Sequence, residues 1–166
     1  MSTATRFASI DDFDKGGVEI IGQDAAPRYL FSNMFEVARQ SRPWERVVVA
    51  KNLEFTIECV RAEGDSPWYL CSHDETALCM QGQVAIEFLK PADAALIPPA
   101  TQDGAVRLAT SPAGATMGRV RLGRGHLALL PAGAAYRFRS AALGVLLVQS
   151  LAGPESVERW AAICQH

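Results

Sequence analysis

The chain has 166 residues, of which 49% are hydrophobic and 20% are charged, a composition typical of a globular protein with a buried core. Its formal net charge is −2 and its pI is about 5.9, so it lacks the basic surface of a nucleic-acid-binding domain. No apolar run approaches the ~20 residues of a membrane-spanning helix, and residues 1–13 carry no secretion signal. We therefore expect one cytoplasmic domain that binds neither nucleic acid nor a membrane.

The N-terminal part, residues 1–45, is predicted to be an arm followed by a short helix. Residues 1–30 show no periodicity and contain turn residues such as Pro27. Ser32 is suited to capping a helix that runs to about Gln40, and Pro43 prevents its continuation. We expect the arm to lie across the surface of the domain or onto a neighbouring subunit.

From Arg46 onward the hydrophobic pattern changes to a period of two. Leu53, Phe55, Ile57 and Cys59 alternate with polar residues, as in a strand with one buried face, and Glu54, Thr56 and Glu58 point the other way. Further strands are predicted at Trp68–Ser72, Glu75–Met80, Val84–Leu89, Thr116–Leu122, Leu127–Leu130, Ala135–Arg139 and Val145–Gln149, with a long loop over Pro91–Gly114. Many short strands with turns between them predict an antiparallel sandwich or barrel over residues 46–152.

The C-terminal residues, 153–166, show helical spacing. Pro154 suits the first position of a helix, and Val157, Trp160 and Cys164 recur at three- and four-residue steps. We expect a helix that packs on the end of the barrel rather than one that docks a partner. The chain has four cysteines without a C-x-x-C pair, and we favour buried free thiols over a disulfide: Cys59, Cys71, Cys79 and Cys164.

Two segments with glycine-containing turns make the fold class more specific. The first ends in ETALCMQG, in which Glu75 and Gly82 are separated by six residues, and the second is GHLALLPAGAAY, from Gly125 to Tyr136. Together, and in this order, they resemble the two motifs of the cupin superfamily. The resemblance implies an all-β fold, a single cupin (double-stranded β-helix or jelly-roll) barrel. The glycines and Pro131 suit tight turns between its strands.

The metal-ligand positions of these motifs are largely replaced. Cupins hold iron, manganese or a similar ion with three histidines and one glutamate that point inward. Glu75 stands at the glutamate position, and Tyr136 replaces the last histidine. The histidine pair falls on Tyr69 and Cys71, on Trp68 and Leu70, or, with a shorter spacer, on Cys71 and His73. In a regular strand His73 and Glu75 would share a face, so these two are the vestigial metal candidates. We expect no metal in this chain, and we expect them to form hydrogen bonds inside a polar barrel.

A more specific resemblance extends over most of the chain. Residues 28–68, the segment HDETALCMQGQV and the segment MGRVRLGRGHLALLPAGAAYRF are similar to the small subunit of the two-component hydroquinone 1,2-dioxygenases. The resemblance implies a degenerate cupin that pairs with a larger cupin subunit in a heterotetramer of two small and two large chains. The large subunit would hold Fe(II) and cleave the hydroquinone ring to 4-hydroxymuconic semialdehyde, and this chain would carry no cofactor and no catalytic residue.

In such a pair the small chain would stabilise its partner and close part of the substrate pocket. Trp68 and Tyr69 are candidates for reaching the partner's pocket, although core packing explains Trp68 equally well. Tyr136 and His73 are candidates for hydrogen bonds to a phenolic ligand. Two other hypotheses remain: an autonomous metal-dependent cupin enzyme that uses His73 and Glu75, and a structural or ligand-binding cupin that forms a homodimer.

Overall fold

The computed structural model describes residues 8–13, 20–21, 28–29 and 33–159, and for the pairs 20–21 and 28–29 it describes the backbone alone. Its elements are β1 (Ile20–Ile21), β2 (Arg28–Tyr29), α1 (Met34–Gln40), β3 (Arg46–Asn52), β4 (Phe55–Asp65), β5 (Trp68–Leu70), β6 (Glu75–Gln81), β7 (Gln83–Pro91), the 3-10 turn η1 (Ala94–Leu96), β8 (Val106–Leu108), β9 (Gly114–Gly123), β10 (Leu127–Leu130), β11 (Ala135–Leu151) and β12 (Ser156–Val157).

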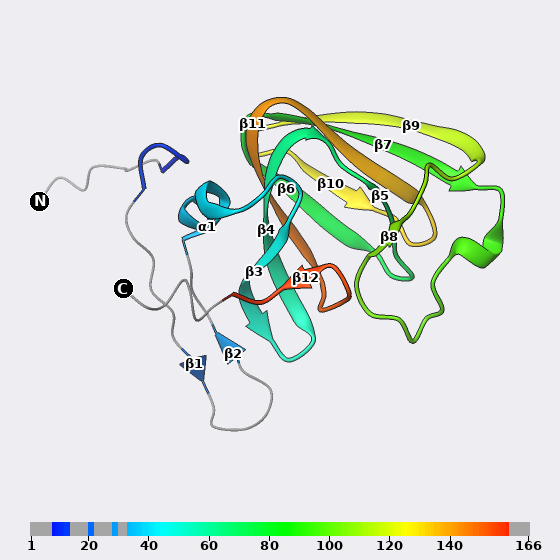
Figure 1. Ribbon diagram of the computed structural model, residues 1–166, viewed down its shortest axis with the longest axis horizontal. Helices are drawn as coiled ribbons and strands as arrows, with labels where there is room; N and C mark the ends of the chain where they lie inside the picture. The colour runs from blue at the N-terminus through cyan, green and yellow to red at the C-terminus, as the bar shows by residue number, and fades with distance from the viewer. Residues whose placement is uncertain (1–7, 14–19, 22–27, 30–32, 160–166) are drawn as a thin grey trace, which may run out of the picture.

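The strands form one sheet that curls around a common interior (Figure 1). Strand β11 organises it, since β11 pairs antiparallel with β4, β5, β6 and β7 along its 17 residues. Strand β3 pairs with β4 on one side and with the short β12, in parallel, on the other. Figure 1 shows α1 lying outside this curled sheet, beside β3 and β4. The predicted all-β barrel is therefore confirmed.

The hydrophobic core has two parts, one inside the barrel and one under the helix. The interior part contains buried aromatic and aliphatic side chains from most strands, including Trp44, Val60, Tyr69, Ile86, Leu130, Phe138 and Leu146. The outer part lies between α1 and the sheet, where Phe35, Val37 and Ala38 meet Val47 and Cys59. Strands β3 and β4 consequently bury residues on both faces near α1.

The predicted helix exists, but its cap differs by one residue. Asn33, rather than Ser32, is the N-cap, and its Oδ1 accepts hydrogen bonds from the backbone N–H groups of Phe35 and Glu36. Both residue types are good caps, so the sequence alone did not distinguish them. Ser32 lies outside the described residues.

The predicted strands are present with different bounds: β5 ends at Leu70 rather than at Ser72, and β9 begins at Gly114 rather than at Thr116. Ala135–Arg139 and Val145–Gln149 belong to the single strand β11, whose pairing with β4 is irregular between Ser140 and Gly144. The predicted loop Pro91–Gly114 contains η1 and the short strand β8, which pairs with β5.

The C-terminal helix prediction is wrong for residues 154–159. Ser156 and Val157 form β12 beside Arg46 and Val47 of β3, and no helix begins at Pro154. The edge of β3 opposite β4 is available at Arg46 and Val47, so the backbone of Ser156 and Val157 pairs with it. These hydrogen bonds replace the helical ones that the three- and four-residue spacing predicted. The remainder of that prediction, residues 160–166, lies outside the described residues.

Strand β4 alternates as predicted, but its polar residues are the buried ones. Thr56 and Glu58 point into the barrel, whereas Phe55 and Ile57 are 56% and 41% exposed. A period of two establishes that the faces differ and leaves open which face is inside.

Cys59, Cys71 and Cys79 are free and buried, as predicted, and burial raises the pKa of Cys59 to about 12 and that of Cys71 to about 11. Cys164 lies outside the described residues. No helix in the described part of the chain is both long and apolar enough to span a membrane.

Two motif glycines have left-handed backbone conformations, with φ +79° at Gly82 and +83° at Gly125. A Cβ atom at Gly82 would lie 2.9 Å from the Cα of Gly144 and 3.0 Å from the carbonyl oxygen of Leu143, whereas one at Gly125 would meet nothing within 4 Å. Both turns therefore favour glycine, and the turn at Gly82 also brings two backbones together.

We predict that Gly82→Ala destabilises the protein more than Gly125→Ala. The second substitution carries only the cost of a left-handed residue, about 1–2 kcal/mol, while the first adds a steric clash with backbone. Urea unfolding of both variants measures the difference. Equal losses of unfolding free energy would contradict the close approach at Gly82.

Candidate functional site

A charged cluster occupies the interior of the barrel, and Arg46 lies at its centre. Arg46 is the first residue of β3, and its side chain turns inward while Val47 packs outward under α1. Only 3% of the Arg46 side chain is exposed. A buried guanidinium requires hydrogen-bond acceptors on several sides, because it has five N–H donors and cannot lose its charge.

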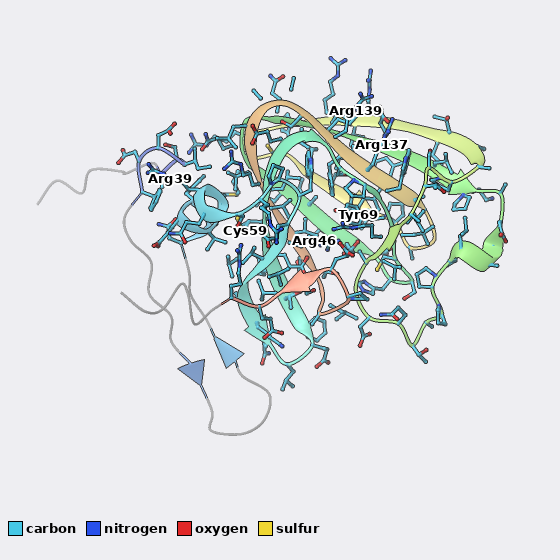
Figure 2. The ribbon with its side chains drawn as sticks, in the orientation of Figure 1. Arg39, Arg46, Cys59, Tyr69, Arg137 and Arg139 are labelled. Carbon is cyan, nitrogen blue, oxygen red and sulfur yellow. The ribbon has the colours of Figure 1, made fainter. Side chains whose placement is uncertain are left out.

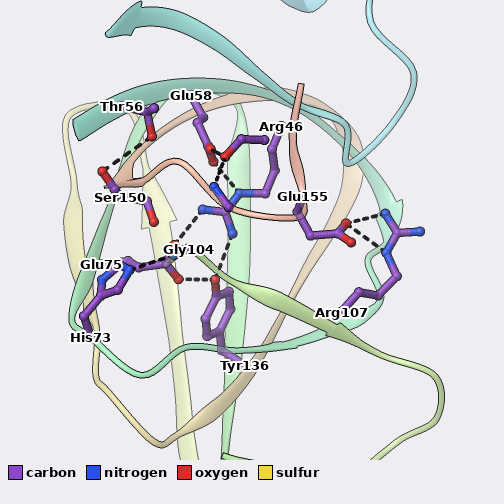
Figure 3. Close-up of polar contacts among 12 residues, drawn as sticks. Arg46, Thr56, Glu58, His73, Glu75, Gly104, Arg107, Tyr136, Ser150 and Glu155 are labelled. Atoms are coloured by element: carbon purple, nitrogen blue, oxygen red, sulfur yellow. Dashed lines mark hydrogen bonds and ion pairs between the residues drawn. The ribbon is translucent and has the colours of Figure 1, made fainter. Parts of the chain in front are cut away.

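Two buried carboxylates supply these acceptors (Figure 3). The Nε of Arg46 donates to Oε2 of Glu58 on β4 at 2.5 Å, and its Nη2 donates to Oε1 of Glu75 on β6 at 2.6 Å. Both glutamates are almost fully buried. One cation thus holds two anions inside the barrel, from strands β4 and β6, which lie on either side of β11.

Two hydroxyl groups complete the cluster. Tyr136 on β11 accepts a hydrogen bond from Nη1 of Arg46 at 3.1 Å and donates one to Oε2 of Glu75. Ser156 on β12 donates to Oε1 of Glu58. Each carboxylate oxygen of the pair therefore has a donor, which removes most of the cost of burying these charges.

The electrostatic effects of the cluster agree with these contacts. Burial by itself raises the pKa of Glu75, but the positive charge of Arg46 and the hydrogen bonds to the carboxylate together outweigh burial, so the pKa lies below its ordinary value of 4.5. Burial and the neighbouring Glu75 raise the pKa of Tyr136 well above its ordinary value. Glu75 is therefore ionised and Tyr136 is neutral at neutral pH, which is the arrangement that the Tyr136–Glu75 hydrogen bond requires.

The cluster coincides with two of the four motif ligand positions. Glu75 and Tyr136 stand at the positions of a metal-binding glutamate and histidine, and both bind the guanidinium of Arg46. A guanidinium provides positive charge and directed hydrogen bonds but no coordination position for a substrate or dioxygen. Among the described residues there is no group of three or more His, Cys, Asp or Glu side chains that could hold a metal ion.

His73 does not join Glu75 in the barrel. Residues 72–73 form a bend before β6 begins at Glu75, so the regular strand that would place both side chains on one face is interrupted. The Nε2 of His73 accepts from the backbone N–H of Gly104 at 3.2 Å, and Nδ1 lies 3.0 Å from the carbonyl oxygen of Asp74. A proton on Nδ1 satisfies both contacts, and His73 thereby holds the loop between η1 and β8 against β6.

The aromatic candidates divide between interior and surface. Tyr69 and Tyr136 are buried with ring centroids 5.7 Å apart, and the guanidinium carbon of Arg46 lies 5.9 Å from the Tyr69 ring. Trp68, the preceding residue, is half-buried, and the guanidinium of Arg137 lies 4.9 Å from its ring. Of the three aromatic side chains Trp68, Tyr69 and Tyr136, only Trp68 is accessible at the surface of this chain.

Sequence reasoning missed Arg46, Glu58 and Ser156. All three lie outside the two motifs, and the polar face of β4 was not predicted to be the inner one. One sequence signal could have identified two of them, because both are charged residues within apolar strands. Arg46 precedes three valines, and Glu58 lies between Ile57 and Cys59. That signal does not identify the partner of either charge.

No protein-family model matches the chain, and no curated protein matches it in sequence. Two solved structures match it at 47% identity over 99% of this chain and 98% of theirs. They are the hydroquinone 1,2-dioxygenase from Sphingomonas sp. TTNP3 with 4-hydroxybenzoate bound, with a TM-score of 0.86, and hydroquinone 1,2-dioxygenase PnpCD in complex with Cd2+ and 4-hydroxybenzonitrile, with a TM-score of 0.82. The chain belongs to the hydroquinone 1,2-dioxygenase family.

Part of a longer chain in this family matches the same fold. A longer chain of PnpCD in complex with Fe3+ matches 81% of this chain and 39% of its own length, at 16% identity and a TM-score of 0.53. A cupin-2 domain protein from Shewanella frigidimarina matches 70% of this chain and 89% of its own, at 15% identity and a TM-score of 0.50. These two matches show the fold alone, and that fold is the cupin barrel.

We predict that Arg46→Met lowers the free energy of unfolding by about 3–5 kcal/mol, because it leaves Glu58 and Glu75 buried without their cation. The matched control is Arg42→Met. The side chain of Arg42 is 88% exposed and forms a 3.6 Å ion pair with Glu45, so its loss should cost less than about 1 kcal/mol. Urea unfolding measures both, and similar losses would show that the buried cluster is not stabilising.

We also predict a pH dependence for Glu75→Gln. Since the pKa of Glu75 is lowered in the folded protein, its contribution is present above the ordinary value of 4.5 and is lost as the pH falls through the lower, folded value. The variant should therefore be less stable than the wild type at neutral pH, and the difference should shrink in acid. Unfolding midpoints across this range test it, with the exposed Glu54→Gln as a control whose effect should stay small throughout. A difference that does not change with pH would contradict the lowered pKa.

Proposed function

We propose that this chain is the small, non-catalytic subunit of a cytoplasmic, Fe(II)-dependent hydroquinone 1,2-dioxygenase. In this proposal a longer cupin subunit holds the iron, and two copies of each chain form a heterotetramer. The reaction inserts both atoms of dioxygen into hydroquinone and opens the ring to 4-hydroxymuconic semialdehyde. The match at 47% identity over nearly the whole chain supports membership of such an enzyme.

The observation that carries the non-catalytic role is the position of Arg46. Its guanidinium binds the side chains at two motif ligand positions, Glu75 and Tyr136, so these groups are already engaged with a cation. His73 is engaged with the backbone of Gly104 and Asp74. A metal ion at these positions would have to displace a buried arginine that already binds Glu58, Glu75 and Tyr136.

The longer family chain supports the other half of the proposal. The PnpCD structures include a chain like this one and a longer chain of the same fold, and PnpCD was solved with Cd2+ and with Fe3+. We assign the iron to the corresponding longer subunit. This chain would then stabilise that subunit and exclude water from part of its substrate pocket, with Trp68 as the accessible aromatic candidate.

The test is co-expression of this chain with the longer subunit, followed by elemental analysis and an assay of hydroquinone cleavage by dioxygen uptake. We expect ring cleavage to require both chains, and we expect the iron content of the complex to be unchanged by His73→Ala in this chain. Substitution of a metal ligand in the longer subunit is the matched control and should remove the iron.

Two results would contradict the proposal. Stoichiometric iron or manganese in this chain by itself, lost on His73→Ala, would favour the autonomous enzyme. Ring cleavage that is unaffected when this chain is omitted, together with failure of the two chains to co-purify, would favour a separate homodimeric cupin.

A further inference from the structure

Arginine side chains gather on the outer face of the three paired strands β9, β7 and β11. Two adjacent rows of side chains cross these strands, with Arg121, Ala85 and Arg139 in one row and Arg119, Glu87 and Arg137 in the next. Ile86 and Phe138 lie between the rows and belong to the interior core, so both rows point outward. Figure 2 shows Arg137 and Arg139 next to each other in the upper part of the view.

This surface has more positive than negative charge. Arg119 and Arg121 are exposed, and neither has an acceptor or an ion pair among the residues that the structure describes. Glu87 pairs with both arginines of β11, at 2.7 Å and 3.4 Å, and Asp65 pairs with Arg139 at 2.8 Å. Four arginines thus face two carboxylates, although the whole chain has a net charge of −2.

An open hollow of about 1080 Å³ includes the arginine-rich end of this surface. Arg119, Arg121 and Arg139 line it, together with small and apolar residues such as Ala85. Ala85 separates Arg121 from Arg139 in their row, and two strand spacings place the Cα atoms of these arginines about 10 Å apart. The short alanine side chain leaves room above it, so both guanidinium groups can contact one ligand held between them.

The far end of the hollow is formed by His126 and by the irregular part of β11. The Nδ1 atom of His126 accepts a hydrogen bond from the backbone N–H of Gly123 at 3.0 Å, so the ring proton lies on Nε2. Ala141 and Ala142 line the hollow where the pairing of β11 with β4 is interrupted. The lining therefore combines an N–H donor and apolar surface with the three arginines.

We propose that this hollow binds a small organic dianion, a dicarboxylate or a phosphate ester, whose charged groups contact Arg121 and Arg139 with Arg119 beside them. A planar guanidinium group forms paired hydrogen bonds with carboxylate and phosphate oxygens. Two arginines without an acceptor favour a ligand with two negative charges, and the apolar residues of the hollow suit its carbon skeleton.

The size and the charge of the site favour a small molecule over a nucleic acid. Ligand pockets typically enclose ~300–1,000 Å³, so a small molecule would fill the arginine-rich end of the hollow. Nucleic-acid surfaces present cations to about 6–10 phosphates along a track, which exceeds the four arginines of these two rows. Binding here would require neither iron nor the longer subunit, so it is independent of the proposed function.

The test is isothermal titration calorimetry of the full-length chain with two dianions, isophthalate as the dicarboxylate and phenyl phosphate as the phosphate ester. Benzoate, which has the same ring and one carboxylate, is the matched monoanion. We expect at least one dianion to bind with a dissociation constant about tenfold or more below that of benzoate, because its second charge meets a second arginine. Added salt should weaken this binding, since the arginines are exposed.

Two variants assign the binding to this hollow. The double variant Arg119→Gln, Arg121→Gln should weaken binding of the dianion by about tenfold or more. Ala85→Glu keeps every arginine but places a carboxylate between two of them, and it should also prevent binding. The matched control is Arg42→Gln, Lys90→Gln, which removes two exposed cations outside the hollow and should bind as the wild type does.

The two dianions distinguish the sources of the charge, because binding of isophthalate alone assigns a dicarboxylate and binding of phenyl phosphate alone assigns a phosphate ester. The proposal is overturned if neither binds, if benzoate binds as tightly, or if the double variant binds as tightly as its control. Binding of the polyanion heparin without either small dianion would indicate a macromolecular partner and would also overturn it. Urea unfolding of each variant verifies that its fold is unchanged.

Discussion

The pairing of Arg46 with Glu58 and Glu75 constrains the rest of the structure. Three charges inside a barrel are tolerated only when each is paired and hydrogen-bonded, because an unpaired one would cost several kcal/mol. The groups that satisfy them come from β3, β4, β6, β11 and β12, so these strands must keep their register for the cluster to form. A shift of β4 by one residue would turn Glu58 towards α1 and leave Arg46 with one carboxylate fewer.

The same constraint explains the unusual outer surface. Because Thr56 and Glu58 occupy the inner face of β4, its apolar residues Phe55 and Ile57 must lie outside. The chain covers part of this side with α1 and leaves the remainder exposed. A polar interior and an apolar exterior on one strand are therefore two consequences of one register.

Turns and ligands of the cupin motifs have separate physical roles. Gly82 and Gly125 have left-handed conformations that determine how the chain reverses, and they serve the barrel whatever it contains. The ligand positions of the motifs bind a metal ion in other cupins. In this chain Glu75 and Tyr136, at two of these positions, bind the guanidinium of Arg46. A chain that keeps the turns and replaces the ligands retains the fold of the dioxygenase family with a different centre.

The sequence by itself determined the strand positions, the short helix and the motif turns, because alternation, capping and left-handed glycines are local properties. It also identified Glu75 and Tyr136 through motif spacing. Only the tertiary structure decided which face of β4 is inside, that β12 replaces the beginning of a helix, and that His73 faces the loop at Gly104. It alone revealed Arg46, whose partners lie 12, 29 and 90 residues away along the chain. A hydrophobic pattern with a period of two is the same whichever face of the strand is buried. The partner of a buried charge depends on which strands pair, and no local sequence signal specifies that pairing.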